Sequence, residues 1–390
     1  MVRDAEITDV QTCVVNGNFD WTLVRVYTDA GIVGIGEAIL GERVADIAAD
    51  TIELLRGENP LNVSRLTELL YRRLSYTGGN AGGVTAAISG VEIALFDLTG
   101  KLLEIPIHQL LGGKFREDVC VYVDSHAGAH LRSAELNDES VFSPTAYADA
   151  AEAVVEDGFD AMKFDLDAAE QFQEDVWNRH LNTHAVSQKA NIVKAVTERV
   201  GDQADVAFDC HWSYGTDSAI RLARSIEDYD VWFLEDPCPP ENAVVPAAVT
   251  TATETPICTG ESLYRASGFL ELITSQSVDI VQPDPPKCGG LRETRRIAEL
   301  ADLYEIPLAL HNVASPIGTL ACVHVAAACS NFLALEYHAR EVEWWGDLIG
   351  GNPIDGKAIP VPDAPGLGVD LDLDVVESHL SDGETLFDEM

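Results

Sequence analysis

Basic residues are scarce in this chain. Among 390 residues there are 25 Lys and Arg, only seven of them Lys, against 65 Asp and Glu, which gives a formal net charge of −40. A field of this sign repels nucleic acid and anionic membrane surfaces, so neither is an expected partner. An acidic surface with little Lys is typical of proteins that stay soluble in concentrated salt, where charge repulsion is screened. We therefore expect a halophilic protein, with an acidic protein from a low-salt organism as the alternative.

Paired cysteines and long apolar runs are also missing. The eight Cys include no CxxC pair and no zinc-type spacing, and several lie inside apolar stretches. No run of about 18 apolar residues occurs, and the N-terminal MVRDAEITDV has no apolar signal core. We expect a soluble, cytoplasmic protein with no membrane partner, whose cysteines are small buried hydrophobes in a reducing compartment.

What the sequence does contain is a series of short apolar strands that each end on a polar residue. They read VAFDCH, VWFLEDP, PICTGES, DIVQPD, LALHN and FLALEY, with the endpoints Asp209, Glu235, Glu261, Asp284, His311 and Glu336. Successive endpoints fall roughly 25 residues apart, about one strand-plus-helix unit of a (β/α)8 barrel. In such a barrel the buried strands are apolar, and their carboxyl ends face the mouth where active sites are built. The spacing predicts an α/β fold, a (β/α)8-type TIM barrel whose strand ends converge on one cavity.

A smaller α+β domain is expected before the barrel. Extended segments at 7–15, 21–27 and 32–38 suit an antiparallel sheet, and helical periodicity follows at roughly 43–56, 62–74 and 84–104. VCVYVDS at 119–125 and AMKFDLD at 161–167 read as the first two barrel strands. We expect a capping domain over 1–115, the catalytic barrel over 116–345, and a C-terminal segment, 346–390, that packs back on the capping domain.

Three carboxylates are candidates for a metal site. Asp209, Glu235 and Glu261 end successive strands, and three such groups cannot sit together ionised unless a cation neutralises them. Hard oxygen ligands select Mg²⁺ or Mn²⁺ over zinc or copper. The sequence therefore predicts a divalent metal held by these residues.

Two histidines are candidates for proton transfer. His311 is the expected general base, because an unperturbed imidazole titrates near neutral pH, and Asp284 on the preceding strand is placed to hold its other nitrogen. His211, two residues after Asp209, is placed to act as an acid on the substrate. Glu336 could hydrogen-bond to a developing enediolate.

These residues and their surroundings resemble the mandelate racemase subgroup of the enolase superfamily, and within it the sugar-acid dehydratases acting on gluconate and galactonate. The resemblance covers nearly the whole chain: AISGVEIALFDLTGK, HQLLGGK, KFD, DCH, LEDP, TGES, QPD with CGG, HN with SPIG, and PGLG. It implies Mg²⁺ at the three carboxylates, a His311–Asp284 base pair, and Lys163 and Glu336 beside the substrate carboxylate. It also suggests a homo-oligomer.

One departure from many racemases of that superfamily bears on the reaction. They carry a second Lys two residues after the first, but here Asp165 stands two residues after Lys163, on the same strand face. Without that second base we expect β-elimination of water, giving a 2-keto-3-deoxy acid from an aldonate such as D-gluconate, D-galactonate or D-xylonate. Racemisation or epimerisation is one alternative, and a non-catalytic, cation-binding barrel is the other.

Substrate selection is expected in loops around the mouth. These are residues 16–21, 75–83 and the strand-end loops with His126, Trp177 and Trp344, while the interval 168–186 is either a lid or a surface extension. Arg179 and Arg340 are the candidates for binding a second carboxylate, which would be needed for a diacid. The scarcity of cations favours a monoacid instead.

Overall fold

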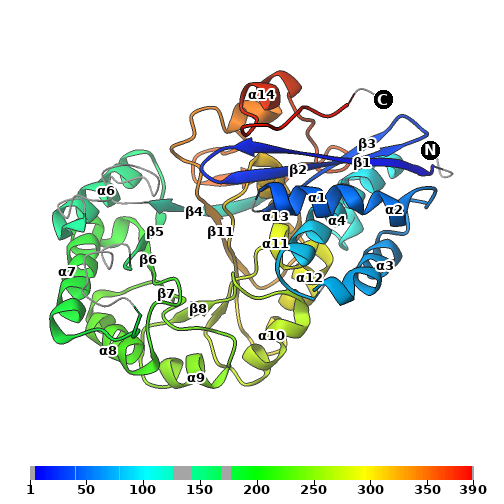
Figure 1. The fold of residues 1–390 in the computed structure, drawn as a ribbon. Helices are drawn as coiled ribbons and strands as arrows, with labels where there is room; N and C mark the ends of the chain where they lie inside the picture. The colour runs from blue at the N-terminus through cyan, green and yellow to red at the C-terminus, as the bar shows by residue number, and fades with distance from the viewer. Residues whose placement is uncertain (1–4, 40, 79, 126–141, 168–176, 389–390) are drawn as a thin grey trace.

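The computed structural model describes residues 5–39, 41–78, 80–125, 142–167 and 177–388. Its N-terminal part contains an antiparallel sheet in the order β1-β2-β3, formed by β1 (Ile7–Asn16), β2 (Asp20–Thr28) and β3 (Val33–Ile39). Five helices follow this sheet: α1 (Glu42–Asp50), α2 (Ile52–Leu55), α3 (Val63–Leu74), α4 (Gly82–Leu103) and α5 (Ile107–Leu110). The predicted α+β arrangement ahead of the barrel is confirmed (Figure 1).

Helix α4 packs closely on β3 because two glycines of the IVGIGEA segment leave room for its backbone. A Cβ atom at Gly34 would lie 2.2 Å from the carbonyl oxygen of Ala94, and one at Gly36 would lie 2.3 Å from that of Gly90. The helix is therefore buried along most of its length.

In the parts of the chain that the structure describes, no helix is long and apolar enough to cross a bilayer.

Eight parallel strands form a closed barrel, as predicted. Their order is β4 to β11 in sequence, and β11 pairs with β4 to close the ring. The strands are β4 (Asp118–Ser125), β5 (Ala161–Asp165), β6 (Asp205–Asp209), β7 (Leu234–Glu235), β8 (Ile257–Thr259), β9 (Ile280–Val281), β10 (Leu308–Leu310) and β11 (Phe332–Tyr337). Parallel pairing places all eight carboxyl ends at one mouth.

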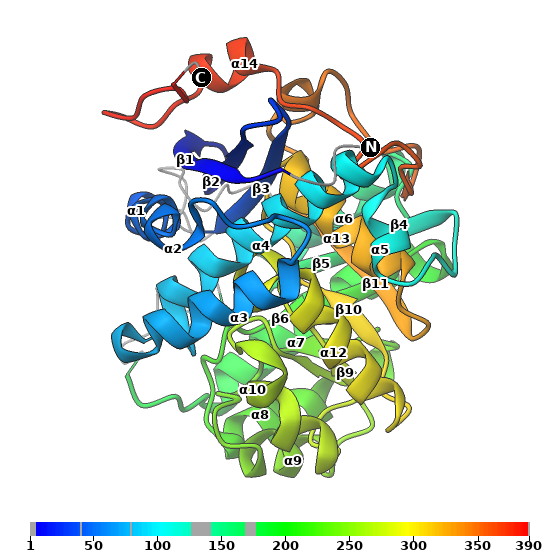
Figure 2. The same ribbon diagram turned by 90° about the vertical axis from the view of Figure 1, so that its right-hand side faces the viewer.

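Helices surround the barrel on its outside (Figures 1 and 2). They are α6 (Pro144–Glu156), α7 (Thr183–Val200), α8 (Thr216–Ile226), α9 (Val244–Thr250), α10 (Arg265–Thr274), α11 (Pro285–Cys288), α12 (Gly290–Asp302) and α13 (Pro316–Ala327). Both α6 and α13 begin with a serine N-cap followed by proline, which satisfies free backbone N–H groups and presets the first turn.

The barrel interior is filled by a cluster with one buried side chain in or beside each strand. Its members are Tyr122, Ala161, Ala207, Phe233, Cys258, Ile280, Ala309 and Ala334. Side chains two positions apart share a face of a strand, so the residues two positions further along also face inward, nearer the mouth. They are Asp124, Lys163, Asp209, Glu235, Gly260, Gln282, His311 and Glu336. The strand period alone therefore brings most of the predicted site residues to one place.

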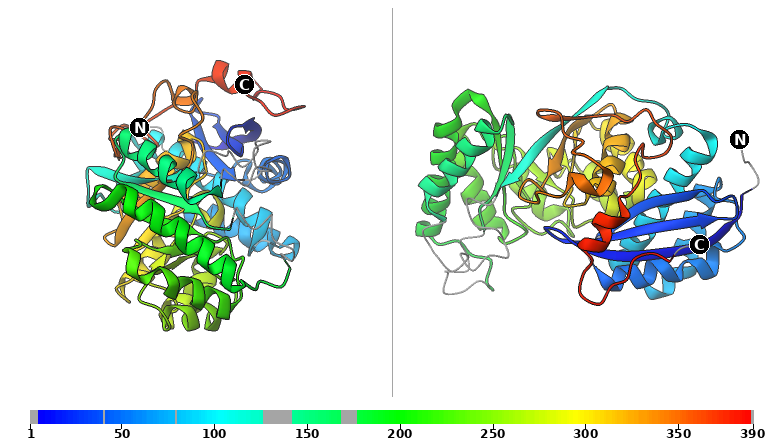
Figure 3. Two further views of the ribbon diagram at one scale, coloured as in Figure 1. Left: turned by 90° about the vertical axis from the view of Figure 1, so that its left-hand side faces the viewer. Right: turned by 90° about the horizontal axis from the view of Figure 1, so that it is seen from above.

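The C-terminal segment returns to the N-terminal sheet. After β12 (Ala358–Pro360), which pairs antiparallel with β4, the chain passes through α14 (Leu373–Ser378) and lies along β1 (Figure 3). The amide of Asn16 donates to the carbonyl of His379 at 2.9 Å, and the amide of Ser381 donates to the carbonyl of Val14 at 2.9 Å. The tail therefore completes the capping region, as expected, while domain boundaries at residues 115 and 345 stay a prediction.

Candidate active site

The buried ammonium group of Lys163 lies at the barrel mouth among four carboxylates. Lys163 on β5 is 1% exposed, and its Nζ lies 2.8 Å from Glu336 Oε1, 3.0 Å from Glu235 Oε2, 3.1 Å from Asp209 Oδ2 and 3.5 Å from Asp124 Oδ2. Burial opposes the charge of Lys163, but the carboxylates of Glu235, Glu336 and Asp209 outweigh it and raise the pKa of the lysine well above its ordinary value. The lysine is a cation that links four strands.

The carboxylates around Lys163 exceed the charge that one ammonium can neutralise. Burial, followed by the charge of Asp209, raises the pKa of Glu235 well above its ordinary value. The Oε1 atom of Glu235 and both carboxylate oxygens of Asp236 are buried and have no hydrogen-bond partner among the described residues. Hard, partnerless oxygens in a negatively charged pocket fit a divalent cation such as Mg²⁺.

His311 on the loop after β10 lies between two carboxylates. Its Nδ1 is 2.8 Å from Asp284 Oδ2, as predicted from the sequence, and its Nε2 is 2.5 Å from Glu261 Oε2. Burial opposes the imidazolium charge, but Glu261 and Glu336 raise the pKa of His311 well above its ordinary value. The same contact lowers the pKa of the Glu261 carboxyl, although burial alone would raise it. The two groups thus form a buried ion pair.

His211 stands at the end of β6 with a partner of its own. Its Nδ1 lies 3.0 Å from Asp167 Oδ1, and Asp167 Oδ2 accepts a 2.9 Å hydrogen bond from the Ser213 hydroxyl. Backbone φ angles of 40° at His211 and 57° at Trp212 turn the chain sharply, so that the His211 amide donates to Asp209 Oδ1 at 3.0 Å. The charge of Asp209 raises the pKa of His211 well above its ordinary value.

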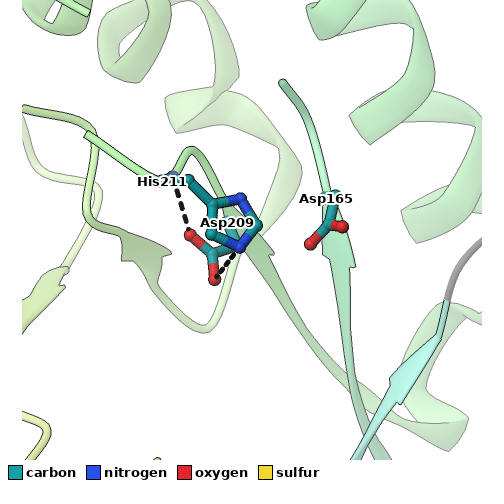
Figure 4. A group of neighbouring side chains, drawn as sticks. All are labelled: Asp165, Asp209 and His211. Atoms are coloured by element: carbon teal, nitrogen blue, oxygen red, sulfur yellow. Dashed lines mark hydrogen bonds and ion pairs between the residues drawn. The ribbon is translucent and has the colours of Figure 1, made fainter. Parts of the chain in front are cut away.

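The grouping of possible metal ligands differs from the expected trio. In the described parts of the chain, the ligand atoms that approach within 4.8 Å of one another belong to Asp165, Asp209 and His211 (Figure 4). Asp209, Glu235 and Glu261 do not form such a group, because Lys163 holds the first two and His311 holds the third. Asp165 on β5 pairs in register with Asp209 on β6.

Several buried polar residues at the site were not predicted. Asp124 ends β4 much as the other candidates end their strands, and this regularity could have revealed it. Gln282 donates to Glu235 Oε2 at 2.8 Å and to the Tyr122 hydroxyl at 2.9 Å. Regular strand alternation would turn Asp236, the neighbour of Glu235, away from the mouth, but its φ of 40° breaks that alternation.

Loops of the capping region reach the mouth where specificity was expected. Asn18 Nδ2 lies 2.9 Å from Nδ1 of His338, just beyond β11, and the indole nitrogen of Trp21 donates to the carbonyl of Val313 at 3.0 Å. From the second loop, Asn80 Oδ1 accepts a 3.0 Å hydrogen bond from Arg265. The predicted loop contacts therefore include a residue, His338, that the sequence did not single out.

The other predicted residues of the strand-end loops differ in their exposure and in their contacts. Trp177 is 89% exposed, and Trp344 stacks on His379 with ring centroids 3.7 Å apart. The guanidinium of Arg340 is held by Asp157, with its Nε 2.8 Å from Oδ2. His126 and residues 168–176 of the proposed lid lie outside the described residues, so the role of the 168–186 interval stays a prediction.

Family models match most of the chain. Residues 10–112 match the N-terminal domain of mandelate racemase and muconate lactonizing enzyme, and residues 146–375 match the enolase C-terminal domain-like family.

Two curated relatives are similar over nearly the whole chain. A D-xylonate dehydratase of Haloferax volcanii is 54% identical over 390 residues, covering 100% of this chain and 92% of that protein. A D-gluconate dehydratase of Thermoproteus tenax is 28% identical over 363 residues, covering 92% of this chain and 69% of that protein. Among solved structures, a mandelate racemase/muconate lactonizing enzyme-like protein from Rubrobacter xylanophilus superposes with a TM-score of 0.92 at 39% identity, covering 99% of this chain and 100% of its own.

Proposed function

Because the chain belongs to the mandelate racemase and muconate lactonizing enzyme family, with its enolase-like C-terminal domain, we propose that it is a sugar-acid dehydratase. The reaction removes the C2 proton and the 3-hydroxyl of an aldonate and yields a 2-keto-3-deoxy acid. D-Xylonate is the first substrate to test, because the Haloferax volcanii relative is named a D-xylonate dehydratase. D-Gluconate and D-galactonate are the next candidates.

One arrangement carries this proposal: two histidine–aspartate pairs stand on opposite sides of the barrel mouth. His211 follows β6 and His311 follows β10, and three strands separate β6 from β10 in either direction around the closed ring. The Lys163 carboxylate cluster lies between them. A substrate held at the cluster would have one imidazole on each side, which suits removal of a proton by one and delivery of a proton by the other.

His311 is the base in this proposal. Asp284 accepts the Nδ1 proton, which fixes the tautomer. Nε2 contacts Glu261 in this structure, and it would take the C2 proton in its neutral form, after Glu261 leaves it. The electron pair of the broken C–H bond then moves into the substrate as an enediolate. Glu336, whose Oε2 also accepts the Asn312 amide at 2.9 Å, lies beside this position and hydrogen-bonds to the enediolate.

His211 is the acid. Asp167 supports its charged form through Nδ1, and Nε2 delivers a proton to the departing 3-hydroxyl, which leaves as water. The enol that remains takes up a proton at C3 and becomes the 2-keto-3-deoxy acid. Lys163 serves as the fixed cation near the substrate carboxylate.

We propose Mg²⁺ as the metal. Asp209, Glu235 and Glu261 would hold it, with Asp236 as a neighbouring oxygen donor, once their oxygens turn away from Lys163 and His311. When bound, the ion stabilises negative charge that develops on the substrate carboxylate. The substrate is a monoacid in this proposal, because Arg340 is already paired with Asp157 and cations are scarce. We also propose activity in concentrated KCl, as the net charge of −40 supports, and a homo-oligomer, as the family resemblance suggests.

The test is a screen of aldonic acids with MgCl₂ in concentrated KCl, with 2-keto-3-deoxy acid as the measured product. D-Xylonate is expected to turn over, and His311→Asn serves as the inactive control. A racemase or epimerase would instead incorporate solvent deuterium at C2 without losing water. A non-catalytic barrel would bind the cation and turn over none of the acids, and either result would overturn the proposal.

A further inference from the structure

A cavity of about 720 Å³ lies outside the barrel mouth, between the N-terminal part of the chain and the barrel. Residues in or beside α3, α4 and α5 line one side of it, and residues of α12 line the other. None of the residues discussed for the strand-end site lines it. Its most unusual property is its charge, because four arginines line it: Arg65, Arg292, Arg295 and Arg296.

Such a concentration is unexpected in this chain. Only 18 arginines and seven lysines face 65 acidic residues, yet three of the four cavity arginines fall within five positions of α12. Glu299 is the acidic residue of the lining. Like charges so close along a helix repel one another, and that repulsion is relieved when an anion binds between them.

Three of the four arginines form ion pairs with glutamates. Arg65 makes two hydrogen bonds to Glu58 at 2.9 and 3.1 Å, Arg295 pairs with Glu299 at 2.9 Å, and Arg296 pairs with Glu293 at 2.7 Å. The guanidinium of Arg292 has no hydrogen bond or ion pair within the described ranges of the chain. Its backbone amide is fixed at 3.0 Å from Glu92 Oε1, which holds this part of α12 in place. A fixed helix position thus presents at the cavity a guanidinium fork with no direct hydrogen-bond partner among the described residues, although its charge also interacts with Glu92 and Glu68.

Helix α3 adds further donors to the same cavity. Asn62, Val63 and Ser64 at its N-terminus belong to the lining, no side chain caps the helix, and its first turn has no acidic residue. Unpaired N–H groups and the helix dipole make such a terminus favourable for an anion. The 12-residue length of α3 is enough for a substantial dipole.

Apolar side chains complete the wall. Leu61, Phe96, Leu110 and Leu111 line it alongside the arginines. The combination suits a small organic anion that has an apolar portion as well as a charged group.

We propose that this cavity is a binding site for a small oxyanion, a carboxylate- or phosphate-bearing metabolite, held by Arg292 and by the N-terminus of α3, with the positive charge of Arg296 beside it. Guanidinium forks match the oxygens of both groups. Since the ligand would contact α3 and α12 at once, its binding stabilises the association of the N-terminal part with the barrel. The inference does not depend on the reaction at the barrel mouth.

The experiment is calorimetric titration of the full-length protein with inorganic phosphate and, separately, with malonate, at constant ionic strength set with KCl. A saturable heat with at least one of the two anions is expected, and their relative affinities distinguish a phosphate ligand from a carboxylate. Arg292→Gln should weaken the apparent affinity about tenfold, and Arg292→Lys should restore part of it because the charge returns without the fork. Arg199→Gln is the matched control, since it removes one exposed arginine on α7 that pairs with Asp149 and Glu152.

Equal affinity in the wild-type, Arg292→Gln and Arg199→Gln proteins would place the anion elsewhere and overturn the proposal. Absence of saturable binding would do the same. Light scattering compares the mass of the assembly formed by the Arg292→Gln, Arg296→Gln double variant with that of the wild-type protein. A smaller assembly in the variant would mean that the cavity is a contact between copies of the chain, which would also overturn the proposal. Thermal unfolding of each variant without anion establishes that it is folded.

Discussion

The Nε2 atom of His311 lies 2.5 Å from Oε2 of Glu261, in a buried contact that faces the centre of the barrel mouth. One imidazole is thereby shared between Glu261 and Asp284, whose Oδ2 is 2.8 Å from Nδ1. The base that we propose and a proposed metal ligand are therefore direct partners. Any change to one must alter the protonation of the other.

The first prediction concerns this contact. Glu261→Gln should lower the pKa of His311 in metal-free protein, because the charge of Glu261 is the main cause that raises it against burial. Histidine-labelled protein titrated by NMR provides the measurement, and His311→Asn identifies the signal among ten histidines. An unchanged pKa would show that the Glu261 contact does not control the imidazole.

Glu235→Gln should weaken Mg²⁺ binding and abolish turnover while the barrel stays folded. The residue lies at a strand end, so the substitution removes a negative charge from the site without leaving a cavity in the core. Calorimetric titration with MgCl₂ and far-UV circular dichroism measure the two effects. Glu241→Gln, an exposed residue after the same strand, is the control for loss of one charge. Full activity of the Glu235 variant after metal depletion would remove the metal from the mechanism.

Lys163→Met should destabilise the metal-free protein by about 3–5 kcal/mol, because it leaves the carboxylates of Asp209, Glu235 and Glu336 buried without their cation. Denaturant unfolding measures this loss. Mg²⁺ should then stabilise the variant more than the wild-type protein, since the ion replaces part of the missing charge. Equal stability of the two metal-free proteins would mean that the ammonium does not neutralise the cluster.

Base and acid are separable by isotope exchange. His311→Asn should stop both deuterium exchange at C2 and loss of water, because the proton acceptor is gone. His211→Asn should slow dehydration by about 10²-fold or more yet leave some C2 exchange, because the leaving hydroxyl lacks its acid. Proton NMR in D₂O follows both processes in one sample. Equal C2 exchange in the two variants would show that His311 is not the base.

The last prediction is a pH effect on stability at the contact between β3 and the segment that follows His311. Burial raises the pKa of Glu37 from 4.5 to about 7, although Ser315 and Gly318 donate hydrogen bonds to it. The folded protein therefore binds this proton more tightly than the unfolded chain, so the contribution is fully present below pH 4.5 and is lost as pH rises to about 7.

For Glu37→Gln, the free energy of unfolding should fall less over this pH range, with a difference on the order of 3 kcal/mol. Denaturant unfolding of both proteins at fixed KCl concentration provides the comparison. Parallel stability curves would show that Glu37 does not titrate in this range.

Much of the fold could be read from the sequence because its signals are local. Apolar strands that end on Asp209, Glu235, His311 and Glu336 recur at the spacing of a barrel, and the alternation of side chains places those ends inside the ring. The glycines of IVGIGEA marked the sheet that α4 covers. None of this requires knowledge of distant contacts.

The pairing inside the site could not be read in the same way. The sequence placed Lys163 and Glu261 at the mouth, but not the ion pairs that join Lys163 to Asp209 and Glu235, or Glu261 to His311. Such partners depend on which side chains reach one another across the ring. The buried, partnerless carboxylate of Asp236 follows a backbone φ of 40°, which its residue type does not predict.

The return of the tail to β1 has a consequence for synthesis. On the edge of β1, the backbone groups of Val14 and Asn16 hydrogen-bond to residues 379–381. The Val14 amide also donates to Glu384 Oε2 at 2.9 Å. Glu384 lies 370 positions after Val14 in the chain, so a nascent chain carries an open strand edge at β1 while the residues between them are synthesised. During that interval the edge can pair with another nascent chain. The capping region is therefore completed only after residues 379–384 have been made, and a chain that stops short of residue 379 leaves this edge of β1 exposed.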